Sequence, residues 1–150
     1  MQMSEDKIHP DDNRSIKKHI DFFGLPICIE ILKGDTKYSK RHDGTIWSRT
    51  MDCDYGYFDG IVSDDGEFLD CYVVNDGANF HRVYAIEQYT TFAAGHKYDE
   101  TKLIVGVNSM HEARELYLKH CQSPECMQFV TSLAIEDLVL WITGNLHVKN

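Results

Sequence analysis

Residues 54–73 read DYGYFDGIVSDDGEFLDCYV, which predicts two strands joined by an acidic turn. Asp65 and Glu67 are two residues apart, so in an extended segment they point to the same side. Gly66 permits a tight bend that brings Asp70 back toward them. Such a group of acids is costly unless a cation is bound, and Mg²⁺ prefers oxygen ligands. Spacing alone leaves two interpretations open, a divalent metal site or a solvated turn, because aspartate and glycine are common turn residues.

The same stretch resembles the core of the soluble (family I) inorganic pyrophosphatases. Tyr55-Gly56-Tyr57 matches the family's tyrosine-glycine-tyrosine strand, and the triplet Asp65, Glu67 and Asp70 matches its acidic element. Other matching segments are Ile29-Glu30-Ile31, Lys37-Tyr38, Arg49 and Asp99-Glu100-Thr101-Lys102. The similarity covers about residues 24–120 and extends to the shorter pyrophosphatase-like domains of phage and mobile-element proteins. The order of these elements along the chain is more specific than any one of them.

The resemblance implies hydrolysis of a phosphoanhydride, most directly inorganic pyrophosphate, with Mg²⁺ as cofactor and Mn²⁺ as the alternative. The implied metal ligands are Asp65, Asp70, Glu67, Asp99, Glu100 and Glu30. The implied catalytic residues are Glu67 as general base, Tyr55, Asp65, Lys37 and Arg49. The implied substrate-binding residues are Lys37, Arg49, Lys102, Tyr117 and Lys119. Positive charge is indeed concentrated before the acidic stretch, at Lys33, Lys37, Lys40, Arg41 and Arg49, although a solvated basic hairpin would give the same pattern.

The chain departs from the family pattern at three places. Glu67 stands where the family has aspartate, which displaces a base by about one ångström and can cost on the order of a hundredfold in rate. Ser39 stands where the family usually has glutamate, and residues 89–97 (YTTFAAGHK) lack a further metal-binding aspartate. Two alternatives therefore stay open. One is a hydrolase of a nucleotide or another phosphorylated small molecule, and the other is a binding module that has lost turnover. In the first, Trp47, Phe58 or Phe92 would line a wider pocket.

Strand-like runs at 27–32, 45–49, 55–62, 68–74, 82–88 and 102–107 predict a small closed β-barrel, α+β overall and similar to pyrophosphatase and OB folds. Helices are expected to pack outside it. One opens with a capping box at Ser109–Glu112, and one repeats Ile135, Leu138, Val139 and Ile142 before Gly144. SIKKHIDFF, residues 15–23, predicts a short helix ended by Gly24, within an N-terminal helical extension of residues 1–23. Residues 1–150 are expected to form one pyrophosphatase-like domain.

Composition narrows the function classes. The 150 residues are 43% hydrophobic and carry a formal net charge of −9, which argues against nucleic acid as a partner. No run approaches the ~20 apolar residues of a membrane span, and the N-terminus is too polar for a signal peptide. We therefore expect a soluble, cytoplasmic protein whose partner is a small phosphorylated substrate, with assembly into hexamers or dimers left open. The five cysteines fit no common zinc pattern, even with His111 and His120 close to Cys121 and Cys126.

Overall fold

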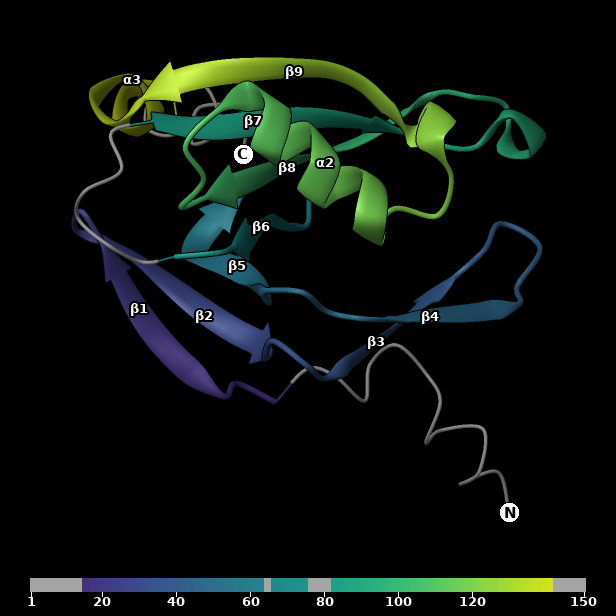
Figure 1. Ribbon diagram of the computed structural model, residues 1–150, viewed down its shortest axis with the longest axis horizontal. Coiled ribbons are helices and arrows are strands. Elements are labelled where there is room, and N and C mark those ends of the chain that lie inside the picture. The colour runs from purple at the N-terminus through teal and green to yellow at the C-terminus, as the bar shows by residue number, and fades with distance from the viewer. Residues whose placement is uncertain (1–14, 64–65, 76–81, 142–150) are drawn as a thin grey trace.

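The computed structural model describes residues 15–63, 66–75 and 82–141. Seven strands form one twisted sheet in the order β1-β2-β5-β6-β8-β7-β9, and β3 and β4 form a separate two-stranded sheet (Figure 1). The strands are β1 Lys18–Phe22, β2 Leu25–Ile31, β3 Thr36–Lys40, β4 Ile46–Thr50, β5 Asp54–Val62, β6 Phe68–Val73, β7 Arg82–Tyr89, β8 Tyr98–Val105 and β9 Met127–Ala134. The helices are α2 Met110–His120 and α3 Ile135–Trp141, with short 3-10 helices η2 Phe92–Ala94 and η3 Pro124–Cys126.

The six predicted strands are confirmed as β2 and β4 to β8, although β8 begins at Tyr98, well before its predicted start. Their periodicity and β-branched content were strong signals. β3 and β9 were not predicted. β3 reads TKYSK, and its charged residues hide the strand pattern.

The predicted helix at residues 15–23 is wrong, because Lys18–Phe22 form strand β1. Ile20 and Phe22 are buried while Asp21 between them is exposed, which is the period of a strand. Phe23 and Gly24 both adopt positive φ, so Gly24 closes a tight turn into β2 and does not end a helix. Residues 1–14 of the predicted helical extension lie outside the described part of the chain.

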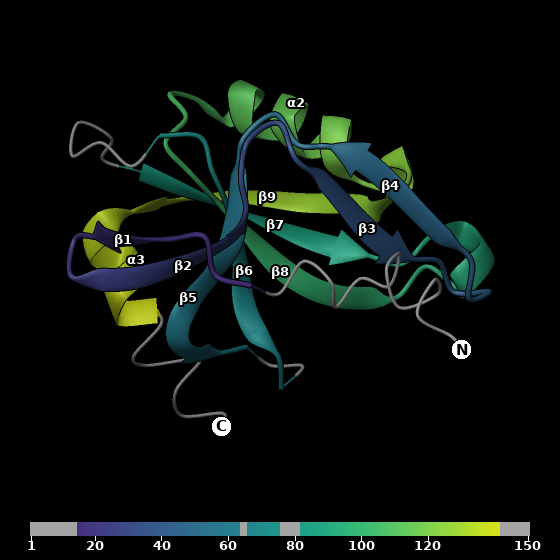
Figure 2. The same cartoon turned by 90° about the horizontal axis from the view of Figure 1, so that it is seen from below.

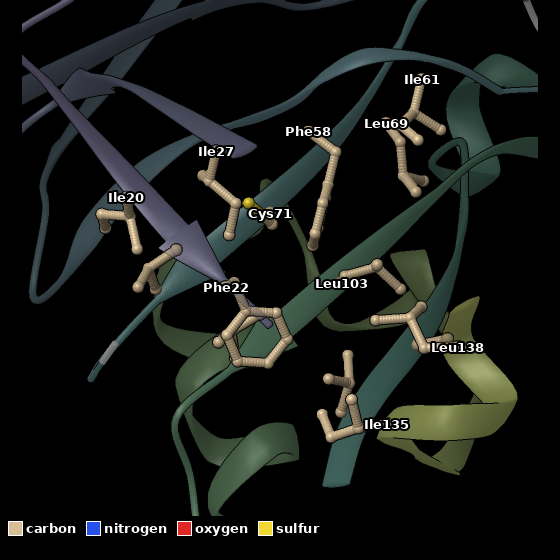
Figure 3. Packing of buried hydrophobic residues seen from close by; sticks show 14 of the residues in the cluster. Ile20, Phe22, Ile27, Phe58, Ile61, Leu69, Cys71, Leu103, Ile135 and Leu138 are labelled. Atoms are coloured by element: carbon tan, nitrogen blue, oxygen red, sulfur yellow. The ribbon is translucent and has the colours of Figure 1, made fainter. Parts of the chain in front are cut away.

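The predicted closed barrel is also wrong. In the described residues, β1 and β9 remain the two edges of an open sheet. Ile135 and Leu138 of α3 share one buried hydrophobic cluster with Ile20 and Phe22 of β1, and Figure 3 shows these side chains meeting inside the curled sheet. Packed side chains need about 10 Å between layers, whereas hydrogen-bonded strands lie about 4.8 Å apart. The two ends of the sheet therefore meet through side chains, and the described part of the chain is mostly β with two α-helices.

A second buried cluster lies beneath α2 and joins it to β5, β6 and β8. The capping residue is confirmed, since Ser109 Oγ accepts a hydrogen bond from Glu112 N at 3.1 Å. The helical period of Ala113, Leu116, Tyr117 and His120 predicts one buried face, and all but the half-buried Leu116 are buried. The period of α3 is confirmed at Ile135 and Leu138, both buried, while Ile142 and Gly144 lie outside the described residues.

The β3–β4 hairpin follows β2 and stands apart from the large sheet (Figure 2). Backbone bonds from Gly34 N to Met51 O and from Met51 N to Asp35 O close its base. At its other end, Gly44 has φ +91°, as the tight turn between Arg41 and Thr45 requires. No helix in the described ranges is long and apolar enough to cross a membrane.

Gly56 allows β2 and β5 to approach closely, so Gly56→Ala tests the strand pair that carries Tyr55. An added Cβ would lie 1.8 Å from the carbonyl oxygen of Cys28, which forces the strands apart. We expect the free energy of unfolding, measured by urea denaturation, to fall by more than about 2 kcal/mol. Ser48→Ala, at an exposed position of β4, should change it by less than about 0.5 kcal/mol. Equal stability of the two variants would contradict this packing.

Candidate active site

A cleft of about 940 Å³ lies between the β3–β4 hairpin and the strands β5 to β8. It gathers most of the residues that the sequence assigned to a site. These are Glu30, Lys37, Arg49, Tyr55, Glu67, Asp70, Asp99, Glu100 and Lys102. Asp65 lies outside the described residues. Tyr117 and Lys119 are not part of the cleft wall.

Lys102 is the centre of the cleft floor. It is buried, with 7% of its surface exposed, and its Nζ donates to Tyr55 Oη at 2.5 Å. The same Nζ lies 3.3 Å from Asp70 Oδ2 and 3.2 Å from Glu100 Oε1. Tyr55 Oη in turn donates to Asp70 Oδ2 at 2.9 Å. A buried ammonium is therefore paired with two carboxylates and a phenol, as a charge in such a place requires.

Strand register brings this cluster together. β6 and β8 run parallel with Cys71 opposite Leu103, which places Asp70 and Lys102 side by side on one face. Glu100 lies two residues before Lys102 and so points the same way. In the neighbouring pair of strands, β5 and β6, Tyr55 is opposite Tyr72 and so lies within diagonal reach of Asp70. Residues from three strands thus meet because the side-chain period of a strand is two.

The environment shifts the pKa of Lys102, Tyr55 and Glu100. Burial alone would lower the pKa of Lys102, but Glu100, Tyr55 and Asp70 raise it well above its ordinary value, so the lysine stays charged. Burial and the charge of Asp70 raise the pKa of the Tyr55 hydroxyl, which stays protonated. Burial also raises the pKa of Glu100, against the opposing effect of Lys102.

The hairpin supplies two further cations. Lys37 and Arg49 are directly opposite each other in the β3–β4 register. Ser39 Oγ accepts from both, from Lys37 Nζ at 3.0 Å and from Arg49 Nη1 at 3.1 Å. Arg49 stacks over Trp47 at 4.0 Å, and Lys37 Nζ lies 4.8 Å from the centre of the Tyr55 ring. The two cations are therefore held in fixed positions on the cleft wall.

Both cations carry unused binding capacity. Arg49 Nε is buried and has no hydrogen-bond partner among the described residues, which suits a donor reserved for a bound anion. Burial first, and then the charges of Lys102 and Arg49, lower the pKa of Lys37 to about 7 against the opposing charges of Asp70 and Glu100. An anion between the two side chains would relieve both effects.

The predicted basic group is a hairpin that also faces the cleft. Lys37, Lys40, Arg41 and Arg49 line it, whereas Lys33 does not. The basic segment therefore has a feature of both interpretations of the sequence. It is a hairpin, and its cations line a concave surface where an anion could bind.

The donor set of the cleft fits Mg²⁺. Its described wall contains the carboxylates Glu30, Glu67, Asp70, Asp99 and Glu100. Within the residues that the structure describes, no three His, Cys, Asp or Glu side chains are close enough to hold a metal by themselves. Mg²⁺ needs only one or two direct carboxylates and takes water and phosphate oxygens for its remaining positions. A carboxylate-lined cleft with this spacing meets that requirement.

Tyr117 and Lys119, predicted to bind the substrate, lie outside the cleft wall and contact other residues. Tyr117 is fully buried, and its hydroxyl donates to Gln88 Oε1 at 2.7 Å. Gln88 Nε2 then donates to Asp99 Oδ2 at 3.0 Å, so Tyr117 reaches the cleft only through Gln88. Lys119 pairs with Asp52 at the surface at 3.6 Å.

Gln88 and Ser39 contact the site residues but were not predicted to belong to the site. Gln88 has no motif of its own, and only its pairing with Glu100 across β7 and β8 brings it to the cleft. Ser39 was noted as a departure from a family pattern, yet its contact with two cations depends on the unpredicted strand β3. The ring nitrogens of His120 contact Asp52 N and Leu116 O, which leaves this histidine engaged with the backbone.

A family model described as Inorganic Pyrophosphatase matches residues 7–143. Among solved structures, an inorganic pyrophosphatase from Coxiella burnetii is similar at 12% identity and a TM-score of 0.40, covering 83% of this chain and 94% of that one. No curated protein matches the chain.

Anion binding should depend on the protonation of Lys37. Sulfate keeps the same charge from pH 6 to 9, so a change in its affinity reports the protein. Lys37 loses its proton as the pH rises through about 7, and sulfate affinity should then fall roughly tenfold, the value of one charge-assisted hydrogen bond. Lys37→Arg should bind sulfate equally across this range, because arginine stays charged. Calorimetry that finds the same pH dependence in both proteins would contradict the assignment.

The residue at position 39 should determine how strongly Lys37 and Arg49 bind an anion. Ser39→Glu adds a carboxylate between Lys37 and Arg49, which should weaken sulfate binding and move its pH dependence to higher pH. Ser39→Ala removes the bridging hydroxyl without adding charge, so it should weaken sulfate binding while the pH dependence stays near that of wild type. A pH dependence that is the same in Ser39→Glu and Ser39→Ala would show that Ser39 does not control these cations.

Proposed function

The chain belongs to the inorganic pyrophosphatase family, and we propose that it hydrolyses inorganic pyrophosphate to two phosphates with the help of Mg²⁺. The observation that carries this proposal is the opposition of two groups across one cleft. The cluster around Lys102 contains the carboxylates Asp70 and Glu100, while the hairpin presents Lys37 and Arg49. Pyrophosphate needs cations along its length and a metal at its oxygens.

The cations would bind and orient the substrate. Arg49 can donate its unpartnered Nε together with a terminal nitrogen to two oxygens of one phosphate. Lys37 would add a point charge beside it and, with a phosphate bound, hold its proton at neutral pH. Lys102 would keep its charge throughout, because Glu100 and Asp70 stabilise it.

The carboxylates would hold the metal ions. Asp70, Asp99, Glu100 and Glu30 line the cleft with Glu67, and Asp65 is proposed as a further ligand. Mg²⁺, when bound, would lower the pKa of water and neutralise the charge on the phosphate oxygens. Tyr55 keeps the Asp70 carboxylate in place through its hydrogen bond to Oδ2, and Gln88 does the same for Asp99.

Glu67 would accept the proton of the attacking water at its carboxylate. Its side chain is exposed on the cleft wall at the end of a turn. Ser63 N and Ser63 Oγ both bond to Glu67 O, at 2.8 and 3.2 Å, and so fix the backbone from which the carboxylate projects. The leaving phosphate would carry its electron pair toward Arg49 and Lys37.

The proposal is tested by phosphate release from pyrophosphate. We expect wild-type protein to release phosphate with millimolar Mg²⁺ and to stop when a chelator removes the ion. A chain that binds pyrophosphate tightly without releasing phosphate, at any Mg²⁺ or Mn²⁺ concentration, would instead support the binding-module alternative.

Glu67→Gln should lower the rate of pyrophosphate hydrolysis by ~10²–10⁴-fold, because the amide cannot accept a proton. Metal binding, followed as the rise in melting temperature on adding Mg²⁺, should persist in this variant. Glu115→Gln, on the exposed face of α2 and outside the cleft, should behave like wild type.

Glu67→Asp then tests the geometry of the base. Faster turnover than wild type would show that the longer side chain is a defect, and slower turnover that the cleft is adapted to glutamate. Full activity of Glu67→Gln would remove Glu67 from the mechanism.

A further inference from the structure

Tyr57 and Phe68 form a stacked aromatic pair on the cleft wall. Their ring centres are 4.5 Å apart and their planes differ by 12°. Both residues line the cleft, and Phe68 keeps 47% of its surface exposed. An exposed ring on a concave surface that already holds charged groups offers a flat apolar face to whatever enters.

The pair lies next to the proposed phosphate site. Tyr57 follows Tyr55 by two residues on β5, and Phe68 precedes Asp70 by two residues on β6, so all four point to the same face. Two residues along a strand correspond to about 7 Å. The aromatic face is therefore separated from the Tyr55 and Asp70 pair by a distance comparable to the sugar that joins a nucleobase to its first phosphate.

The cleft is larger, and has more cations, than two phosphate groups require. Its volume of about 940 Å³ is within the range of pockets that hold organic ligands of drug size. Lys40 and Arg41, near the hairpin tip, also line the cleft beside Lys37 and Arg49. A longer anion would thus find further cations and an aromatic surface within the same cleft.

The aromatic residues first considered for a wider pocket do not form this face. Phe58 is 1% exposed in the hydrophobic core, and Phe92 lies against His96 outside the cleft wall. Trp47 lines the cleft, but Arg49 stacks on its ring. Among the described aromatic residues that line the cleft, Phe68 is the most exposed.

We propose that the site also accepts nucleoside polyphosphates, with the base stacked on Phe68 and the terminal phosphoanhydride between Lys37, Arg49 and the carboxylates. This inference rests on the proposed function, because the same hydrolysis is applied to a larger substrate. A water oxygen forms a bond to the terminal phosphorus as the phosphoanhydride bond breaks. The water proton passes to Glu67, and the electron pair leaves with the oxygen of the shortened nucleotide.

The experiment compares substrates with and without a base. We measure kcat/KM for pyrophosphate, inorganic tripolyphosphate and four nucleoside triphosphates with Mg²⁺. The variants are Phe68→Leu, Phe68→Ala, Phe68→Tyr and the control Phe129→Ala, an exposed phenylalanine on β9 outside the cleft. Phe68→Leu keeps an apolar contact with Tyr57 and serves if Phe68→Ala does not fold. Calorimetry with a non-hydrolysable nucleoside imidotriphosphate gives the binding constant directly.

Loss of the ring should lower the ratio of kcat/KM for nucleotide to kcat/KM for tripolyphosphate about tenfold, mainly through KM. Stacking of a base on an aromatic ring contributes about this much to binding and depends little on which base is bound. The binding constant of the imidotriphosphate should weaken by a similar factor. Phe68→Tyr should restore both values, and Phe129→Ala should leave them unchanged.

Three results would overturn the inference. If both substrates lose efficiency equally in the Phe68 variants, the ring has only a structural role. If wild type cleaves pyrophosphate but no nucleotide, the substrate class is wrong while the proposed function stands. If wild type cleaves neither, the proposed function fails as well.

Discussion

The buried ammonium of Lys102 is the interaction on which the site depends. A charge in that position must be paired, and Tyr55, Asp70 and Glu100 pair it from three strands. The parallel register of β6 and β8 sets Asp70 beside Lys102, and the side-chain period of β8 adds Glu100. Two carboxylates that would repel each other are thereby held on one face. Removing the lysine would leave them unpaired in a partly buried place, so the same contact serves the sheet and the site.

The hairpin gives the opposite wall its positive charge. Lys37 and Arg49 are crowded enough for the pKa of Lys37 to fall to about 7, through burial and through the charges of Lys102 and Arg49. Ser39 orients both cations without neutralising them. Such a wall is incomplete without an anion, while the carboxylate floor is suited to a divalent cation. The metal-bound diphosphate that we propose as the ligand would satisfy both walls at once.

The sequence predicted the central strands and several of the residues that line the cleft, because each signal was local. Three motifs can be recognised without any knowledge of the fold: the tyrosine-glycine-tyrosine strand, the acid at 70 and the acid-x-lysine element at 100–102. What it missed depends on pairing between distant segments. Residues 15–23 were predicted to form a helix because the lysines of this segment hid the alternation of Ile20 and Phe22. The sheet was predicted to close, whereas its β1 end shares a side-chain cluster with α3. Gln88 reaches the cleft through the pairing of its strand with β8, and Tyr117 contacts the cleft through its hydrogen bond to Gln88.

The most direct test of the central claim is an anomalous difference map from crystals grown with Mn²⁺ and imidodiphosphate, a non-hydrolysable analogue of pyrophosphate. The account predicts a manganese peak in contact with the carboxylate of Asp70 or Glu100. It also predicts a diphosphate that bridges this peak to Lys37 and Arg49. A diphosphate bound elsewhere on the protein, or manganese held only by residues outside the cleft, would contradict the claim that the Lys102 cluster and the hairpin form one active site.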